Sequence, residues 1–177
     1  MSENIEEPNF EIIETYDGFE IRRYADTIQA RVIVEGMGYR NTNQAFRRIA
    51  SYIFGRNDKS RNIAMTAPVR MWESGDFSVM AFTMPSKHRM SDLPNPTDSG
   101  VELLHVEGGV VAVLKFSGLS HRKKSLRMIN KLHLMLENNG LVASSEAILA
   151  VYDNPASTLP FIRRNEIIQP IEWHREE

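Results

Sequence analysis

The five histidines are the first candidates for chemistry in this chain, and their spacing does not favour a metal site. They are His88, His105, His121, His133 and His174. No pair has the His-x-x-x-His spacing, and none sits in a cluster of carboxylates, the patterns typical of zinc or non-haem iron. His133 falls on the buried side of a predicted helix, where a hydrogen bond to a carbonyl explains it, whereas His88 lies in a loop and can reach a ligand. The sequence therefore predicts no metal site.

Covalent catalysis and nucleotide binding also lack support in the sequence. The chain has no cysteine and no Gly-x-Ser-x-Gly elbow, so no activated nucleophile is indicated. Gly36-Met37-Gly38 lacks the further glycine of a dinucleotide loop, and no Gly-Lys-Ser/Thr occurs. We therefore name no catalytic residue, and a binding role is favoured over an enzymatic one.

The bulk composition limits the remaining classes of function. A chain of 177 residues, 42% hydrophobic and 25% charged, is expected to form one globular domain, here residues 10–177 behind a loose tail of residues 1–9. The formal charge of -2 gives no reason to expect nucleic-acid binding. No apolar run approaches the ~18 residues of a membrane span, and the N-terminus does not resemble an export signal. With no cysteine in the chain, a reducing cytoplasm is the expected location.

Two helices are expected to hold the side chains of interest. The first starts after a cap at Thr42 or Asn43 and ends at Gly55, with a core stripe of Phe46, Ile49 and Ile53 that is flanked by Ala45 and Tyr52. Ala50 and Phe54 widen this apolar arc beside Arg47. Either loops cover the extra width, or it lines a ligand groove with Arg47 at the rim.

The second helix is expected from His121 to Asn138, with Ser120 as N-cap and Gly140 just past its end. Its core stripe holds Leu126, Ile129, Leu132 and Leu136. Arg122, Lys123 and Lys124 crowd the first turn, where the helix dipole disfavours cations. These three form either a solvated basic face or a contact with an anion.

Strands account for most of the remaining chain. An Asp17-Gly18 turn between two β-rich runs predicts a hairpin. Ile63–Val69 is expected to be a core strand that turns a corner, because it is apolar and Pro68 suits a strand end. The predicted strands are 10–16, 19–24, 29–35, 63–72, 77–84, 101–106, 110–116, 147–152 and 162–171.

The order of these elements repeats halfway along the chain. Val32–Gly36, a helix and two strands correspond to Leu114–Gly118, a helix and two strands. The half-repeats run approximately over residues 29–85 and 110–171. Two βαββ units give an α+β fold with the helices packed on a curved antiparallel sheet or open barrel. We expect a ligand groove at the seam between the repeats, near the first helix and the loop around residues 155–157.

Several segments resemble the SOUL family of haem-binding proteins, and they occur in order over residues 10 to 171. Ile63–Val69 looks like the family signature, and Phe19–Tyr24 resembles its Tyr-Glu-Ile-Arg-x-Tyr opening. The other matching segments are Met84–Lys87, Leu93–Pro96, Val113–Gly118 and Phe161–Glu166. The resemblance implies two βαββ repeats that form a distorted antiparallel β-barrel flanked by two helices. It also implies that haem or another tetrapyrrole binds in an apolar groove beside the first helix.

The sequence departs from the family at two places that concern iron. Arg23 stands where some members carry a histidine suggested as the axial ligand, and Pro155-Ala156-Ser157 lacks the aromatic residue that often follows proline there. We therefore expect a ligand-tolerant groove without an iron ligand. Its predicted residues are Arg47 and Lys59 at the rim, Ala50 and Phe54 on the floor, and Ala156 and Ser157 opposite; Arg47 matches a basic position of the family's pocket helix.

Three functions remain open at this stage. The first is a non-covalent carrier or buffer for haem or another tetrapyrrole. The second is an effector-binding or sensor module for other flat apolar molecules, because effector domains of bacterial regulators share the architecture. The third is an enzyme that removes iron from haem or otherwise modifies it.

Overall fold

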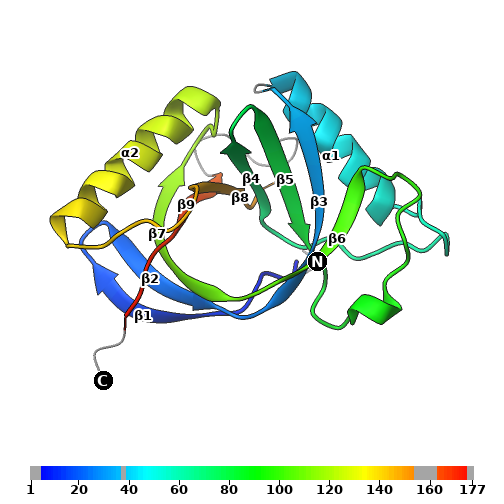
Figure 1. The fold of residues 1–177 in the computed structure, drawn as a ribbon, viewed down its shortest axis with the longest axis horizontal. Coiled ribbons are helices and arrows are strands. Elements are labelled where there is room, and N and C mark those ends of the chain that lie inside the picture. The colour runs from blue at the N-terminus through cyan, green and yellow to red at the C-terminus, as the bar shows by residue number, and fades with distance from the viewer. Residues whose placement is uncertain (1–4, 37–38, 154–162, 175–177) are drawn as a thin grey trace. The chain divides into compact units, whose positions relative to one another are not determined.

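The computed structural model describes residues 5–36, 39–153 and 163–174. The chain divides into two compact units, one from Met1–Pro8 and Asp26–Glu107, the other from Asn9–Ala25 and Gly108–Glu177. Each unit places a long helix on antiparallel strands (Figure 1). The predicted α+β class is therefore confirmed.

The first unit contains four strands and the helix α1. The strands are β3 (Thr27–Glu35), β4 (Val69–Ser74), β5 (Phe77–Thr83) and β6 (Val101–Val106), in the order β4-β5-β3-β6. The helix α1 (Tyr39–Ile53) lies along β3 and β5, and a short 3-10 helix, η1 (Met90–Asp92), precedes β6. The core of this unit lies between α1 and the sheet.

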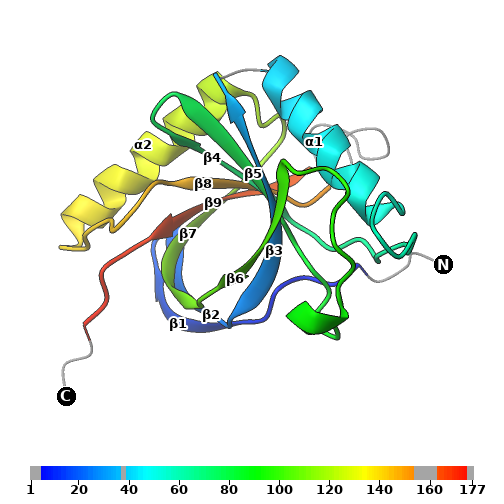
Figure 2. The ribbon, with the colours of Figure 1, turned by 45° about the vertical axis from the view of Figure 1, so that its right-hand side comes forward.

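The second unit contains five strands and the helix α2. The strands are β1 (Phe10–Tyr16), β2 (Phe19–Tyr24), β7 (Gly109–Ser117), β8 (Ile148–Val151) and β9 (Arg164–Pro170), in the order β1-β2-β7-β9-β8. The helix α2 (Arg122–Asn138) packs against one face of β7 and β9 (Figure 2). The predicted hairpin is confirmed, since Tyr16 pairs with Phe19 across Asp17-Gly18 and Gly18 has a φ of 89°.

The two βαββ repeats share one pairing scheme. In the first repeat β3 and β4 both pair antiparallel with β5, and in the second β7 and β8 both pair antiparallel with β9. Gly36 and Gly118 end the first strand of each repeat at φ 82° and 96°, a left-handed conformation that glycine adopts at little cost. The amide of Gly36 donates to Asp76 O, and that of Gly118 donates to Arg163 O. The repeat predicted from the sequence is therefore confirmed.

Two helix starts differ from prediction. The helix α1 begins at Tyr39 rather than after Thr42 or Asn43, so both of these residues lie inside the helix. The N-cap of α2 is His121 rather than Ser120, and its Nδ1 accepts a hydrogen bond from the amide of Lys124 at 3.1 Å. A neutral imidazole nitrogen can take the role of a capping oxygen. Gly140 follows α2 with φ 68°, as expected.

The prediction of a strand over Ile63–Val69 is wrong for most of its length. β4 begins only at Val69, and the preceding segment runs outside the sheet with a cis bond between Ala67 and Pro68. The segment is held by other bonds: the Ile63 amide donates to Ile53 O at 2.8 Å, and Thr66 Oγ1 donates to Thr83 O at 2.5 Å. Pro68 has no amide hydrogen for a sheet ladder, so pairing starts after it.

Candidate functional site

The helix α1 is fixed to its unit by a buried face and two polar anchors. Ala45, Ile49, Tyr52 and Ile53 are all buried. The Tyr52 hydroxyl donates to Pro94 O at 2.7 Å, and burial raises its pKa to about 12. The Arg48 guanidinium donates two hydrogen bonds of 2.7 Å to Asp98 and lowers the pKa of that carboxyl to about 2. The remaining face of α1 is therefore held in a defined position.

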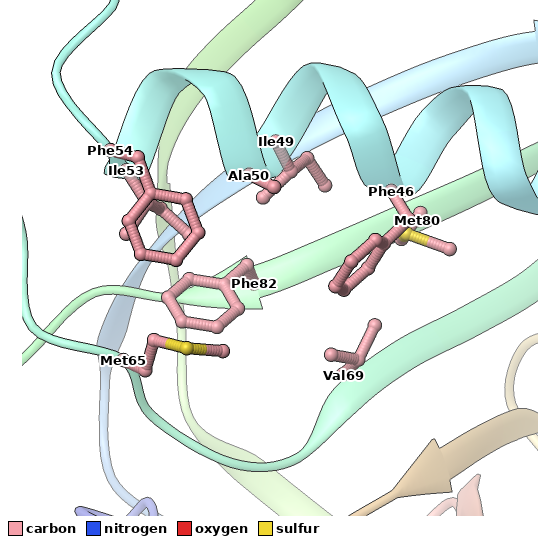
Figure 3. Close-up of a pocket in the computed structure, with 9 residues that line it drawn as sticks. All are labelled: Phe46, Ile49, Ala50, Ile53, Phe54, Met65, Val69, Met80 and Phe82. Atoms are coloured by element: carbon pink, nitrogen blue, oxygen red, sulfur yellow. The ribbon is translucent and has the colours of Figure 1, made fainter. Parts of the chain in front are cut away.

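An apolar pocket runs along that remaining face (Figure 3). Its volume is about 300 Å³, which includes space open to solvent. The described residues that line it are all apolar: Phe46, Ile49, Ala50, Ile53, Phe54, Met65, Val69, Met80 and Phe82. The pocket lies where the sequence offered two alternatives for the wide apolar arc of the first helix, a cover of loops or a ligand groove, and its position matches the groove.

The floor and the mouth of this pocket differ in exposure. The floor consists of Ile49, Ile53, Met80 and Phe82, each at most 3% exposed. At the mouth, Phe46 is 45% exposed, Phe54 is 62% exposed and Met65 is 45% exposed. Figure 3 shows the rings of Phe46, on α1, and of Phe54, the residue that follows α1, pointing toward the segment that carries Met65 and Val69. Large apolar side chains left exposed around a concave apolar surface are one feature of binding surfaces in general.

The loop after α1 is ordered by one buried asparagine. Asn57 is 4% exposed, and its amide group donates to Tyr52 O at 3.0 Å and to Arg61 O at 2.8 Å. Its carbonyl oxygen accepts from the amides of Lys59 and Arg61. This loop carries the exposed Lys59 on a fixed backbone next to the end of the pocket helix.

The six residues predicted for the site have different places in the structure. Ala50 and Phe54 both line the pocket, Ala50 half-buried and Phe54 at the mouth. Arg47 is exposed on α1, one turn before Ala50, which places it along the same edge of the helix. Lys59 lies in the loop described above. Ala156 and Ser157 lie outside the described residues.

Sequence reasoning missed a large part of the lining. Met65 and Val69 belong to the segment that was expected to be a strand, and Met80 and Phe82 come from β5, across the sheet. Phe46, Ile49 and Ile53 were assigned to the core stripe of α1, yet they also line the pocket. The apolar, uncharged character of Ile63–Val69 was the only sequence feature that could have indicated its contribution to the pocket. The sequence does not show which element faces α1.

The described residues contain no group of three or more histidine and carboxylate side chains that could hold a metal ion. The only metal-ligating atoms in the described pocket lining are the thioether sulfurs of Met65 and Met80, and Met80 is 3% exposed. His133 is exposed rather than core, and its Nε2 lies 2.8 Å from the Gln169 side-chain oxygen. The pocket thus favours contact with an apolar surface over ligation of a metal.

The second unit holds a buried ion cluster built from two of the family-like segments. The Arg22 guanidinium is 2.6 Å from a carboxylate oxygen of Glu20 and 2.6 Å from one of Glu166, and it also donates to the Tyr24 hydroxyl at 2.9 Å. The Tyr152 hydroxyl donates to Glu166. These bonds join β2 to β9 and to the end of β8.

The charges of this cluster stabilise one another. Burial opposes the charge on Arg22, but its partners Glu166, Tyr24 and Glu20 together outweigh burial and raise the pKa of that guanidinium. Burial likewise opposes the charge on Glu20, yet Arg22 and Lys115 lower its pKa. The pKa of Tyr152 is raised by burial and by the Glu166 carboxylate. The cluster is therefore a satisfied, ionised network inside the unit, and its segments serve structure there.

Comparison with known proteins places these features in a family. The family described as SOUL heme-binding protein matches residues 5–170. The chain belongs to the SOUL family. It is 32% identical over 158 residues to the human protein named Heme-binding protein 2, covering 84% of this chain and 76% of that protein. It is 27% identical over 131 residues to Heme-binding protein 1 of Bos taurus, covering 70% of this chain and 67% of the relative.

The fold of this SOUL-family chain also occurs in distant solved structures. An uncharacterised conserved protein from Listeria innocua superposes with a TM-score of 0.67 at 13% identity, covering 87% of this chain and 92% of the other. At that identity the likeness concerns the fold alone. The resemblance inferred from the sequence motifs is confirmed at the level of the family, which supports possible non-covalent haem binding.

Proposed function

We propose that this chain is a non-covalent carrier or buffer for haem or a related tetrapyrrole, and that the apolar pocket beside α1 is its binding site. The observation that carries the proposal is the pocket itself. It is wholly apolar in the described residues, and it has exposed aromatic and thioether groups at its mouth. It lies in a chain whose family binds haem.

A flat ligand would contact the apolar lining of this pocket with one face or edge. The phenyl rings of Phe46 and Phe54 and the side chain of Met65 would cover the porphyrin, while the buried floor supplies a firm apolar base. Covering on the order of 400 Å² of apolar porphyrin surface at ~25 cal/mol per Å² gives roughly 10 kcal/mol before association costs. Costs of several kcal/mol leave affinity on the order of micromolar, which suits a carrier that must release its ligand.

The charged edge of a porphyrin needs a cationic partner. Arg47 lies on α1 beside the pocket edge, and Lys59 lies in the ordered loop that follows the helix. Each can meet a propionate carboxylate with a charge-assisted hydrogen bond. The proposal extends to Ala156 and Ser157, which would lie opposite α1 and cover the other face of the porphyrin.

The proposal also holds that the protein binds haem without modifying it. The described lining offers no proton donor, no proton acceptor and no cysteine. We therefore expect haem to leave the protein unaltered. Residues 10–177 are proposed to work as one domain in a reducing compartment such as the cytoplasm, which fits the absence of cysteine.

Site-directed variants test where the ligand binds. Phe54→Ala removes an exposed ring at the pocket mouth, whereas Phe77→Ala removes a ring that is 44% exposed at the start of β5, outside the lining. We expect Phe54→Ala to weaken protoporphyrin binding by roughly tenfold, because a half-exposed ring contributes about 1.5 kcal/mol when covered. Phe77→Ala should bind like the unchanged protein. Equal affinity of both variants would place the site elsewhere.

Charge variants and a time course complete the test. Arg47→Gln should weaken binding of protoporphyrin but not of its dimethyl ester, which lacks the propionate charges, while Lys87→Gln should change neither. Haemin incubated with the protein should keep its absorption spectrum over hours. A product that accumulates with time would replace the carrier with an enzyme, and equal affinity for unrelated flat aromatic compounds would favour a sensor of broader specificity.

A further inference from the structure

The helix α2 concentrates positive charge on a chain that is negative overall. Its residues Arg122–Asn138 include five basic side chains and one acidic side chain, a formal charge of +4, whereas the whole chain carries -2. The acidic residue, Glu137, lies in the last turn. A positive charge of this size on one helix of a negatively charged chain points to a partner that is itself anionic.

Three of the five cations lie on the side of α2 that faces away from its own sheet. The helix buries Ser125, Leu132 and Leu136. Lys123, Arg127 and Lys131 follow one another at intervals of four residues on the opposite side, and all three are exposed. They form no ion pair with the described residues, so their charges are available to a partner.

Leucines are interleaved with these cations. Leu134 is 61% exposed and lies three residues after Lys131, and Leu126 is 37% exposed and precedes Arg127. We call Lys123, Leu126, Arg127, Lys131 and Leu134 the α2 outer face. A helix that combines a basic row with exposed leucines resembles one that lies in the plane of a lipid headgroup layer.

We propose that the α2 outer face docks onto an anionic lipid bilayer surface. The leucines enter the boundary between headgroups and acyl chains, and the long cationic side chains extend to the lipid phosphates. A nucleic acid offers the leucines no apolar partner. The residues that dominate protein interfaces are enriched in tryptophan and tyrosine and poor in leucine, whereas the apolar part of this face is leucine.

Sedimentation with vesicles tests the proposal. The full chain should sediment with vesicles of phosphatidylglycerol and phosphatidylcholine but not with phosphatidylcholine alone, and added salt should release it. Each cation near an anionic surface strengthens binding about fivefold, so Lys123→Gln/Arg127→Gln/Lys131→Gln should weaken it on the order of 100-fold. Leu126→Ser/Leu134→Ser should weaken it without changing the salt dependence.

A matched triple variant controls for net charge. Arg56→Gln/Arg61→Gln/Lys87→Gln removes three exposed cations from the first unit and should bind vesicles like the unchanged protein. Circular dichroism confirms that each variant is folded. Equal binding by the two triple variants, no binding of the unchanged protein to anionic vesicles, or tighter binding to a DNA duplex than to vesicles would each overturn the proposal.

Discussion

The buried pair of Arg22 and Glu166 yields a stability prediction that the structure makes quantitative. The side chains are 2% and 4% exposed, and Arg22 Nη2 lies 2.6 Å from Glu166 Oε2. The change Glu166→Gln keeps the shape of the side chain and removes its charge. The guanidinium then remains buried with Glu20 as its one carboxylate partner among the described residues, and that carboxylate is shared with Lys115.

The expected cost follows from this burial. Removing one partner of a buried ion pair destabilises a protein by about 3–5 kcal/mol, because the other charge stays desolvated without full compensation. In a chain of this size each kcal/mol lowers the melting temperature by about 2–4 °C, so we expect a fall of roughly 6–20 °C. The amide of glutamine can still accept from the Tyr152 hydroxyl, so the charge is the main loss.

A second ion pair with similar geometry provides the control. Arg48 Nη2 and Asp98 Oδ1 are 2.7 Å apart, but the side chains are 30% and 39% exposed. Solvent screens such a pair, so Asp98→Asn should cost about 1 kcal/mol or less. Urea unfolding followed by circular dichroism measures both variants. Equal costs, or a larger cost for Asp98→Asn, would refute the argument that burial decides the contribution of these pairs.

Three further predictions concern single residues. Arg48 lowers the pKa of Asp98 from 3.8 to about 2, so this pair stabilises the protein above about pH 4 and its contribution disappears as the pH falls toward 2. Asp98→Asn should therefore flatten that part of a curve of stability against pH. An unchanged curve would contradict the contribution of this pair to stability. Met65→Ala should weaken haemin and metal-free protoporphyrin alike, by about fivefold, in fluorescence titrations, because the loss is of apolar contact; a loss confined to haemin would mean that the sulfur binds iron. His121→Ala should lower the free energy of unfolding by about 1 kcal/mol in urea, whereas Ser120→Ala should change it little, because His121 supplies the N-cap of α2.

The repeat and the class of fold could be predicted because both depend on local patterns. A glycine at the end of a β-rich run, followed by an amphipathic segment, occurs at Gly36 and again at Gly118, and both glycines adopt the left-handed conformation. The Asp17-Gly18 hairpin is equally local. Each of these features is decided by a few neighbouring residues, so the sequence contains the information.

The pocket could be predicted only in part, because it depends on which elements face one another. Ala50 and Phe54 could be named from the width of the apolar arc on α1. Met65 could not, because its apolar neighbours favoured a strand, while Pro68 delays strand pairing until Val69. Phe82 contributes from β5, distant in sequence from the helix, and no periodicity in either segment records their contact.

The ion cluster could not be predicted for the same reason. Glu20 and Arg22 alternate on one strand, as charged residues on a solvated face do. Their burial follows from the pairing of β2 with β7 and of β7 with β9, which brings Glu166 to Arg22 across 144 positions of sequence. The motif was visible in the sequence, but its partners were not.

The most direct measurement is a paired titration of the protein with haemin and with metal-free protoporphyrin. Binding is followed by the Soret band and by quenching of Trp72, which lies on β4 about 10 Å from Val69 of the pocket, in a Trp173→Phe background. An apolar pocket without an iron ligand predicts similar affinity for both, on the order of micromolar. Failure of both to bind at that concentration, or much tighter binding of haemin that a single histidine substitution abolishes, would contradict it.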